Sequence, residues 1–452
     1  MQPFAAYPTS TIAAVATPTG VGAVSLVRLS GPAALAVADL ATGGRAAHMT
    51  PRHAHHCRIV DAAGEVLDDG LMVVFRAPNS FTGEDSVEFS GHGGMLVTRE
   101  VLGRLLACGA VAAGPGEFTQ RAFLNGKLDL TQAEGVMDLI AAQSRLALRA
   151  ARSQLEGTLG RRTTAARDEV LATLAHLEAW IDFPDEDIQP HTGESLRAGV
   201  SSVLATLDAL LATAEQGRVL RDGARTVIFG PPNVGKSSLL NRLLGFERAI
   251  VSAVAGTTRD TIEEIVSLYG IPLRLVDTAG VRQAGDALEA AGIQRTERQI
   301  ETADLLLEVA DASLPRPPAM VLPASGAKRL LLLNKSDLGE HASWHAVAGV
   351  RVSCASGAGF GELAAAIRDA LHFNEAEWGE QAIAINTRHL ASLQTARGAL
   401  LGALDLLATP ASDPELAAID LRDALDALGE IPGRVDTEDL LGEIFSRFCI
   451  GK

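Results

Sequence analysis

The stretch Gly230-Pro231-Pro232-Asn233-Val234-Gly235-Lys236-Ser237-Ser238 decides the fold of this chain. It follows the apolar run Thr226–Phe229 and precedes a helical pattern at Leu239–Leu244. A strand, a glycine loop and a helix in this order form a phosphate-binding P-loop, in which backbone N–H groups and the helix N-terminus face the phosphates. We therefore expect Asn233 to Ser238 to surround a nucleoside triphosphate, with Lys236 at the β- and γ-phosphates and Ser237 on Mg²⁺.

Two further stretches fit a nucleotide site. Ser252-Ala253-Val254-Ala255-Gly256-Thr257-Thr258-Arg259-Asp260 precedes a predicted hairpin with its turn at Tyr269–Pro272, and the second strand of this hairpin ends at Asp277-Thr278-Ala279-Gly280. A carboxylate at the carboxyl end of a strand meets the Mg²⁺ shell, Thr258 can complete that shell, and the Gly280 N–H can reach the γ-phosphate. A plain glycine turn before a helix would not account for these motifs.

Two later motifs select guanine. The apolar run Arg329–Leu333 ends in Asn334-Lys335-Ser336-Asp337, and a further strand ends in Ser353-Cys354-Ala355. The Asp337 carboxylate can accept hydrogen bonds from the ring N–H and the amino group of guanine, which adenine does not offer in that geometry. We expect Asn334 to hold the purine and the local loop, and the segment 353–355 to present an N–H to the guanine oxygen. The predicted nucleotide is GTP.

The expected hydrolytic site lacks one common group. Many GTPases orient the attacking water with a Gln after the D-x-x-G glycine, whereas Val281 follows Gly280 here. An apolar side chain cannot orient water, so either hydrolysis is slow or another group and a partner supply the missing charge. Asp286 and Glu289 lie in the next segment and could do so, although a solvated helix start is the more ordinary explanation of both.

Composition and charge restrict the class of protein. The chain has 452 residues, enough for about three domains. Its formal net charge of −16 argues against coating nucleic acid by bulk electrostatics, so contact with RNA must be local or made by a partner. Four separated cysteines, Cys57, Cys108, Cys354 and Cys449, suit a reducing compartment. No apolar run approaches the ~18 residues of a membrane span and no leader is evident, which predicts a cytoplasmic protein.

The predicted fold is multidomain and combines α/β with all-α parts. Residues 1–125 form a small α/β domain, residues 126–218 and 376–452 are helical, and residues 219–375 form a Ras-like P-loop domain inserted between them. One interrupted helical domain is the simplest arrangement, and two separate helical domains are the alternative. The first domain has expected strands at Ile12–Ala16, Val24–Leu29, Arg58–Asp61, Leu71–Phe75 and Ser86–Phe89, and expected helices at Pro32–Leu40 and Met95–Ala107.

Two stretches of the first domain could bind a ligand. His53, His55, His56 and Cys57 are clustered. Neighbouring strand residues point to opposite faces, however, and no second set of ligands follows, so a solvated strand edge is preferred over a metal site. In Phe81–Gly94 a strand ends in a glycine-rich turn before a helix, where a planar or anionic ligand can approach the backbone. From spacing alone, a structural turn is the simpler explanation.

The chain resembles the MnmE (TrmE) family of bacterial tRNA-modification GTPases over essentially its full length. The resemblance is carried by the GTPase motifs, by Gly256-Thr257-Thr258-Arg259-Asp260 and by the C-terminal Phe448-Cys449-Ile450-Gly451-Lys452. Val27-Arg28-Leu29-Ser30-Gly31, Thr82–Gly94 and Gly116–Leu130 match as well. It implies an N-terminal folate-binding α/β domain that dimerises, a discontinuous helical domain and an inserted GTPase domain.

For catalysis, the resemblance implies a K⁺ ion in place of an arginine finger when two GTPase domains meet. Asn233 would bind this ion through its side chain, and the backbone carbonyls that would bind it belong to Ser252, Val254 and Thr257. Ser252 stands where Thr is frequent, which matters little for a carbonyl ligand. Glu289 matches the water-activating glutamate of the family and would take the role of the missing Gln.

For the folate, the resemblance points to Arg28, Glu88, Lys127 and Lys452. Cations suit a glutamate-tailed cofactor, and a carboxylate can accept from the pterin amino edge. The implied cofactor is a 5-formyl or 5,10-methylene tetrahydrofolate. Cys449 is similar to a near-terminal cysteine of the family, and its role as nucleophile or packing residue stays open. The alternative for this domain is a dimerisation platform without folate.

The resemblance also implies a reaction and a partner. An FAD-containing protein of the MnmG type would join the homodimer in a heterotetramer or larger complex. Together they would add an aminomethyl or carboxymethylaminomethyl group at carbon five of the wobble uridine of certain tRNAs. The acidic charge agrees with a partner that makes much of the tRNA contact. A regulatory GTPase switch in ribosome assembly is the alternative, but such a factor needs an RNA module, often basic, and no strongly basic segment appears.

Overall fold

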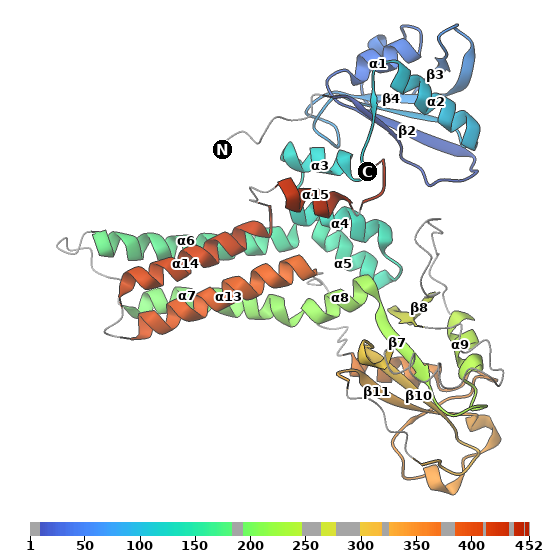
Figure 1. Ribbon diagram of the computed structural model, residues 1–452, viewed down its shortest axis with the longest axis vertical. Helices are drawn as coiled ribbons and strands as arrows, with labels where there is room; N and C mark the ends of the chain where they lie inside the picture. Colours follow the sequence, from blue (N-terminus) through green and yellow to red (C-terminus); the bar gives the residue numbers. More distant parts are fainter. Residues whose placement is uncertain are drawn as a thin grey trace. The chain divides into compact units, whose positions relative to one another are not determined.

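The structure is a computed structural model. It describes residues 10–182, 193–245, 264–276, 299–318, 325–371, 385–409, 413–433, 438–446 and 448–451 (Figure 1). The chain divides into two compact units, which are described separately. The first unit is Met1–Met137 with Gly429–Lys452, and the second is Asp138–Leu428. This division does not coincide with the predicted domain boundaries, because the C-terminal segment belongs to the same unit as the N-terminal α/β segment.

The first unit is built on a six-stranded sheet. Its strand order is β3-β4-β5-β2-β1-β6, with only β1 and β6 parallel. The strands are β1 (Ile12–Val15), β2 (Val24–Ser30), β3 (His55–Val60), β4 (Val66–Phe75), β5 (Ser86–His92) and β6 (Val111–Ala112). Helices α1 (Ala34–Ala41) and α2 (Met95–Ala107) share one hydrophobic core with the sheet, and the short helix η1 (Ala46–His48) follows α1. Five strands and both helices confirm the predicted elements.

The strand β3 begins three residues before the predicted start. His56 is exposed and Cys57 is completely buried, so the two side chains lie on opposite faces, as expected for adjacent strand residues. Burial raises the pKa of the Cys57 thiol to about 11. A protonated thiol inside the core is a packing group, not a metal ligand.

The C-terminal segment folds onto the N-terminal sheet within the first unit. Helices α3 (Glu117–Leu124) and α15 (Glu438–Ser446) contact each other. Beyond α15, Ile450 bridges to Pro115, and the Gly116 N–H donates to the Cys449 carbonyl over 3.3 Å. A side chain at Gly451 would overlap the Val15 carbonyl at the end of β1. The tail therefore needs glycine at this position to reach the sheet.

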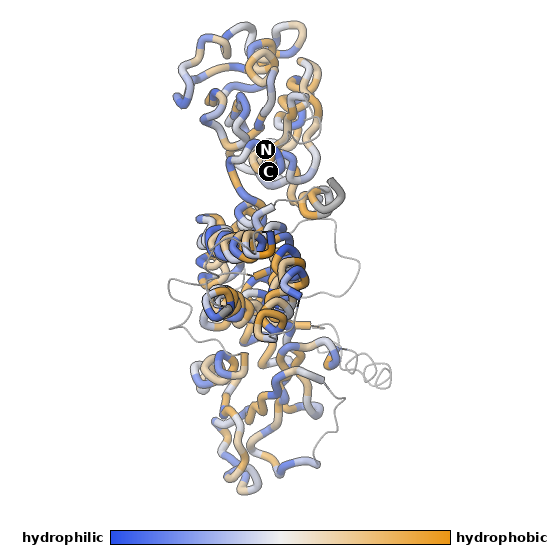
Figure 2. The backbone as a smooth tube through the Cα atoms, turned by 90° about the vertical axis from the view of Figure 1, so that its left-hand side faces the viewer, coloured by the Kyte–Doolittle hydropathy of each residue, from blue (hydrophilic) through white to orange (hydrophobic). Residues whose placement is uncertain are grey.

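The second unit contains a helical bundle that the nucleotide domain interrupts. Its helices are α4 (Leu130–Ala141, which begins in the first unit), α5 (Arg145–Leu155), α6 (Thr158–Asp182), α7 (Gly193–Ala212), α8 (Ala214–Asp222), α13 (Thr387–Ala408) and α14 (Pro414–Glu430). The helix α13 packs on α7, which precedes the interruption, and Arg397 of α13 donates to Asp208 of α7 over 2.6 Å. Figure 2 shows hydrophobic and hydrophilic residues interchanging along these helices. One interrupted bundle, rather than two helical domains, is confirmed.

One helical stretch, Glu194–Asp222, is long and apolar enough to cross a membrane by length and composition. The sequence analysis expected none. Within this stretch α7 packs against α13 and α6, and Val203, Leu207 and Leu210 are buried. The core helix of a bundle meets the same criteria, so the packing of α7 favours that explanation.

The nucleotide domain is a mostly parallel sheet with helices. The strand order is β12-β11-β10-β7-β9-β8, with only β8 antiparallel to its neighbour. Its elements are β7 (Ala224–Phe229), α9 (Lys236–Gly245), β8 (Glu264–Leu268), β9 (Ile271–Leu275), β10 (Leu305–Asp311), β11 (Lys328–Asn334), η2 (Ser336–Leu338), η3 (Ala342–Trp344), β12 (Val350–Arg351) and α12 (Phe360–Ala370). The predicted hairpin is present, and its turn at Tyr269 and Gly270 has positive φ angles at both residues. The predicted fold class is confirmed.

The bundle and the nucleotide domain share a hydrophobic core in the second unit. Ala150 of α5 and Val219 and Leu220 of α8 belong to the same buried cluster as residues of β7, β9 and α9. The helix α8 also contacts β9 and continues through Gly223 directly into β7. The strands of the nucleotide domain and the helices α5 and α8 of the bundle are therefore in direct contact through packed side chains.

Candidate functional site

The P-loop joins the end of β7 to the start of α9 and lies against the strands. Gly230 has a φ of 143°, and a side chain there would overlap the Val309 carbonyl of β10. Gly235 has a φ of 98°, and a side chain there would overlap the Asn334 amide. Both positions require glycine because the loop passes so close to its neighbours. The loop therefore lies over the carboxyl ends of the parallel strands, where nucleotides bind in open α/β sheets.

Lys236 is folded into this loop. Its Nζ donates to the carbonyls of Gly230 and Pro231 over 2.8 and 2.6 Å. Burial lowers the pKa of its ammonium from the ordinary value. Both acceptors are neutral, so the loop holds a cation without neutralising its charge. Ser237 and Ser238, which follow at the first turn of α9, are exposed.

Asn334 joins the P-loop to the segment that follows β12. It lies at the end of β11 and is 2% exposed. Its Nδ2 donates to the Val234 carbonyl over 2.8 Å, and its Oδ1 accepts from the Cys354 N–H over 3.2 Å. One buried amide thus satisfies a donor and an acceptor in two loops that are far apart in the sequence. The expected role of Asn334 in holding the local loop agrees with this geometry.

Lys335 adds a second link to the P-loop. Its backbone is left-handed, with a φ of 62°, and its Nζ donates to the Asn233 carbonyl over 3.1 Å and pairs with Asp311 over 2.6 Å. Burial alone would raise the pKa of Asp311, but hydrogen bonds from Lys335 and Ser313 outweigh it and hold this pKa below the ordinary value. Asp311 is not among the site residues that the sequence motifs predicted. A carboxylate at the carboxyl end of an apolar strand was the available signal.

The two groups expected to contact guanine lie beside Asn334. Asp337 is exposed in η2, and its carboxylate accepts no hydrogen bond from the described residues. The turn after β12 is held by buried Ser353, whose N–H donates to the Ala358 carbonyl over 3.0 Å. The Cys354 N–H is used by Asn334, whereas the Ala355 N–H donates to no group in the described part of the chain. Ala355 is therefore the better candidate for the guanine oxygen.

Ten of the predicted site residues lie outside the described residues, and their roles stay predictions. They are Ser252, Val254, Thr257, Thr258, Asp277, Thr278, Ala279, Gly280, Glu289 and Lys452.

In the first unit, the predicted folate residues Arg28 and Glu88 form an ion pair. They stand at paired positions of β2 and β5, and Arg28 Nε lies 2.9 Å from Glu88 Oε1. The guanidinium carbon lies 5.8 and 5.6 Å from the ring centroids of Phe81 and Phe118. The predicted residue Lys127 donates to the Pro78 carbonyl over 3.0 Å. A cation, a carboxylate and two aromatic rings therefore meet at one place, which suits a planar, charged ligand.

A buried polar network fixes the turn that begins at Phe81. Ser30 contacts Thr82 and Glu84 over 2.6 and 2.8 Å, and the Glu84 carboxylate accepts from Arg121 of α3 over 3.2 Å. Arg121 is 1% exposed and also pairs with Glu117 over 2.8 Å. The sequence analysis assigned no role to Glu84 or Arg121. The signal that could have identified Arg121 as a buried, paired residue is its place on the apolar side of a short amphipathic helix.

The fold and the site of the second unit define a P-loop GTPase. Residues 130–449 match the family model of the MnmE helical domain, and residues 11–127 match that of the GTP-binding protein TrmE N-terminus. The chain therefore belongs to the MnmE (TrmE) family.

Relatives cover nearly the whole chain. A protein of Akkermansia muciniphila named tRNA modification GTPase MnmE is 54% identical over 447 residues, which are 98% of this chain and 99% of that protein. The protein of the same name from Opitutus terrae is 46% identical over 455 residues, with the same coverage. Among solved structures, the FeoB G-domain from Methanococcus jannaschii is 26% identical and covers 32% of this chain and 96% of its own. Its TM-score of 0.22 is too low to carry an argument.

We predict that Asn334→Ala and Asp337→Ala separate stability from nucleotide recognition. Removing the buried amide leaves the Val234 carbonyl and the Cys354 N–H unpaired, which costs about 2–4 kcal/mol. Asn334→Ala should lower both the unfolding temperature and GTP affinity, measured by calorimetry and by binding of a fluorescent GTP analogue. Asp337→Ala should lower GTP affinity alone, because Asp337 is exposed. Equal unfolding temperatures for the two variants would contradict the structural role of Asn334.

Proposed function

We propose that this GTPase uses GTP hydrolysis to drive the modification of a uridine in tRNA. The observation that carries the proposal is the linkage of the P-loop and the 353–355 segment through Asn334, in a chain whose relatives are named tRNA modification GTPases along almost their full length. The finer reaction follows the family resemblance. It adds an aminomethyl or carboxymethylaminomethyl group at carbon five of the wobble uridine, together with an FAD-containing partner of the MnmG type. We place this reaction in the cytoplasm.

The charge distribution supports a partner for tRNA binding. The formal net charge of −16 gives no general attraction to a polyanion. Within the described residues, several exposed arginines are paired with carboxylates, as in Arg422 with Glu178 and Arg351 with Glu340. A basic surface of the partner would supply phosphate contacts, while GTP binding and hydrolysis by this chain would drive a conformational change.

We predict that a strain without this protein lacks the wobble-uridine modification and that the plasmid-borne wild type restores it. Lys236→Ala should not restore the modification, because the variant lacks the P-loop ammonium group that would contact the β- and γ-phosphates. Mass spectrometry of tRNA nucleosides measures the outcome. Fully modified uridine in the deleted strain would refute the proposed function. Arg58→Ala, an exposed position on β3, is the control that should restore modification.

The P-loop residues fit a Mg²⁺–nucleotide complex. Ser237 lies in the first turn of α9 with an exposed side chain, and Lys236 is hydrogen-bonded to carbonyls of the loop. Gly230 and Gly235 let the loop pass close to β10 and to Asn334. Ser237 and Thr258 would hold Mg²⁺, which neutralises phosphate charge when bound. Lys236 would exchange its carbonyl partners for the β- and γ-phosphate oxygens.

A K⁺ ion is proposed to replace an arginine finger. Asn233 has a left-handed backbone with a φ of 64° and an exposed side chain, so its amide oxygen is accessible to an ion at the mouth of the loop. Ser252, Val254 and Thr257 would contribute backbone carbonyls. The ion would stabilise charge that develops between the β- and γ-phosphates. Glu289 would orient water, because Val281 cannot.

We predict that GTP turnover per protein molecule rises with protein concentration in K⁺ and falls on the order of tenfold when Na⁺ replaces K⁺ at equal ionic strength. Pairing of two GTPase domains accounts for the concentration dependence. Asn233→Ala should lose most of the K⁺ stimulation while keeping GTP affinity, since the Asn233 side chain is exposed. Phosphate release measures turnover. Equal rates in both salts at every concentration would rule out the ion as a catalytic element.

The residues of the first unit fit a reduced folate. The Arg28–Glu88 pair is partly exposed and lies beside the rings of Phe81 and Phe118. Lys127, three residues after the end of α3, is proposed as a second cation. A 5-formyl or 5,10-methylene tetrahydrofolate would supply the one-carbon unit when bound. Glu88 would accept from the pterin amino group, Arg28 would hold this carboxylate in place, and Lys127 would supply positive charge for the glutamate tail. Lys452 is proposed as a further cation, and two copies of this unit would form the homodimer.

We predict that Arg28→Ala weakens binding of 5-formyltetrahydrofolate by about 10–100-fold, the worth of a hydrogen bond to a charged group. The loss should be visible in isothermal titration calorimetry with the full-length protein. Arg58→Ala removes a cation from an exposed position of β3 and should bind as the wild type does. Unchanged affinity of Arg28→Ala would remove the proposed folate site and favour a domain that only dimerises.

A further inference from the structure

Three polar residues of the first unit meet near one edge of its sheet, and a fourth, His56, contacts one of them. His56 belongs to the edge strand β3, Asp68 and Asp69 belong to β4, and His92 ends β5. One ligand atom from each of Asp68, Asp69 and His92 lies within 4.8 Å of the other two. His56 Nε2 lies 3.5 Å from Asp69 Oδ2. None of these residues belongs to the predicted nucleotide or folate sites.

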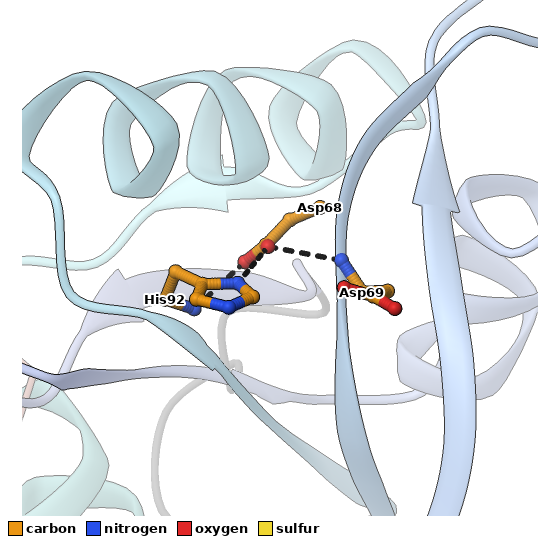
Figure 3. A group of neighbouring side chains, drawn as sticks. All are labelled: Asp68, Asp69 and His92. Atoms are coloured by element: carbon orange, nitrogen blue, oxygen red, sulfur yellow. Dashed lines mark hydrogen bonds and ion pairs between the residues drawn. The ribbon is translucent and has the colours of Figure 1, made fainter.

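Asp68 is a fixed support for His92. Its Oδ1 accepts from His92 Nδ1 over 2.6 Å and from the Asp69 N–H over 2.9 Å, while its Oδ2 accepts from the His92 N–H over 2.9 Å (Figure 3). The Asp68 side chain is 5% exposed, and a side chain at Gly91 would overlap its carboxylate. The glycine therefore makes room for a buried carboxylate, and this carboxylate is committed to three hydrogen bonds.

This support sets the tautomer of His92. A carboxylate accepts the hydrogen bond, so Nδ1 carries the proton and Nε2 keeps its lone pair in the neutral ring. The His92 side chain is 69% exposed, so Nε2 is accessible. Histidines that bind metals donate their other ring N–H to a carboxylate in the same way, which fixes the ring and raises its basicity.

One distance in this group agrees with a shared metal ion. Two ligand atoms bound at ~2.0–2.1 Å in tetrahedral geometry lie about 3.4 Å apart, close to the separation of His56 Nε2 and Asp69 Oδ2. Imidazole together with carboxylate favours zinc and neighbouring transition metals over Mg²⁺ or Ca²⁺. Cys57, which the sequence placed beside His56, points into the core and cannot contribute.

We propose that Asp69 and His92 bind a divalent transition metal of the zinc class, that the exposed His56 side chain turns toward them as the third ligand, and that Asp68 positions His92. A metal bound here would link the edge strand β3 to β4 and to the end of β5. An edge strand has unpaired backbone groups along one side and is the first part of a sheet to separate. A metal bound only by the folded sheet would stabilise the first unit by mass action.

The test is a titration of the nucleotide-free, full-length protein with Zn²⁺ alone, followed by calorimetry. A Cys449→Ser background removes an exposed thiol that could also bind zinc. The hydrogen bond and the charge of Asp68 raise the pKa of His92, so the proton competes with the metal, and the titration is made at about pH 8. The wild type should bind one equivalent of Zn²⁺, and Zn²⁺ should raise its unfolding temperature.

Three variants complete the experiment. His92→Ala and Asp69→Asn should each bind Zn²⁺ at least tenfold more weakly and lose the increase in unfolding temperature. His53→Ala removes an exposed imidazole from the same histidine-rich stretch and should behave as the wild type. Because Asp69 is exposed, we expect Asp69→Asn to fold. This variant therefore still tests the site if His92→Ala does not fold. No saturable binding to the wild type, or equal binding by the wild type and Asp69→Asn, would overturn the proposal and leave only a His–Asp ion pair.

Discussion

The nucleotide site depends on one buried amide. Asn334 donates to the P-loop and accepts from the segment after β12, so the loop that would hold phosphates and the segment that would meet the base are parts of one hydrogen-bonded structure. Lys335 strengthens it through the Asn233 carbonyl and Asp311. Because water is excluded from Asn334, neither loop can move away without leaving a polar group unpaired.

This rigidity has a consequence for the rest of the second unit. The strands that carry the site share a hydrophobic core with α5 and α8 of the bundle, and α8 runs directly into β7. A nucleotide-dependent change in these strands would reach the bundle through packed side chains rather than through a flexible linker. The proposed function needs such a path, because GTP hydrolysis must change the conformation of parts outside the nucleotide domain.

In the first unit a buried charge, rather than a buried amide, connects neighbouring segments. Arg121 is almost completely buried and is compensated by Glu84 and Glu117, which connect the turn at 81–85 to α3. A buried guanidinium is tolerated only when its partners are held in place, so the turn, α3 and the adjoining sheet must form together. The same unit receives the C-terminal tail, whose glycine at 451 passes against β1. Residues from both ends of the chain thus contribute to the surroundings of the proposed folate site.

Local signals in the sequence determined the P-loop, the guanine motifs, the interrupted bundle and most strands. The reason is that glycine requirements, alternation and strand-end carboxylates act over a few residues. Only the tertiary structure showed that Asp311 pairs with Lys335, that Glu84 compensates the buried Arg121, and that His56 contacts Asp69. These arrangements depend on strand order and register, which bring together residues 13 to 37 positions apart in the sequence and leave no periodic trace in it.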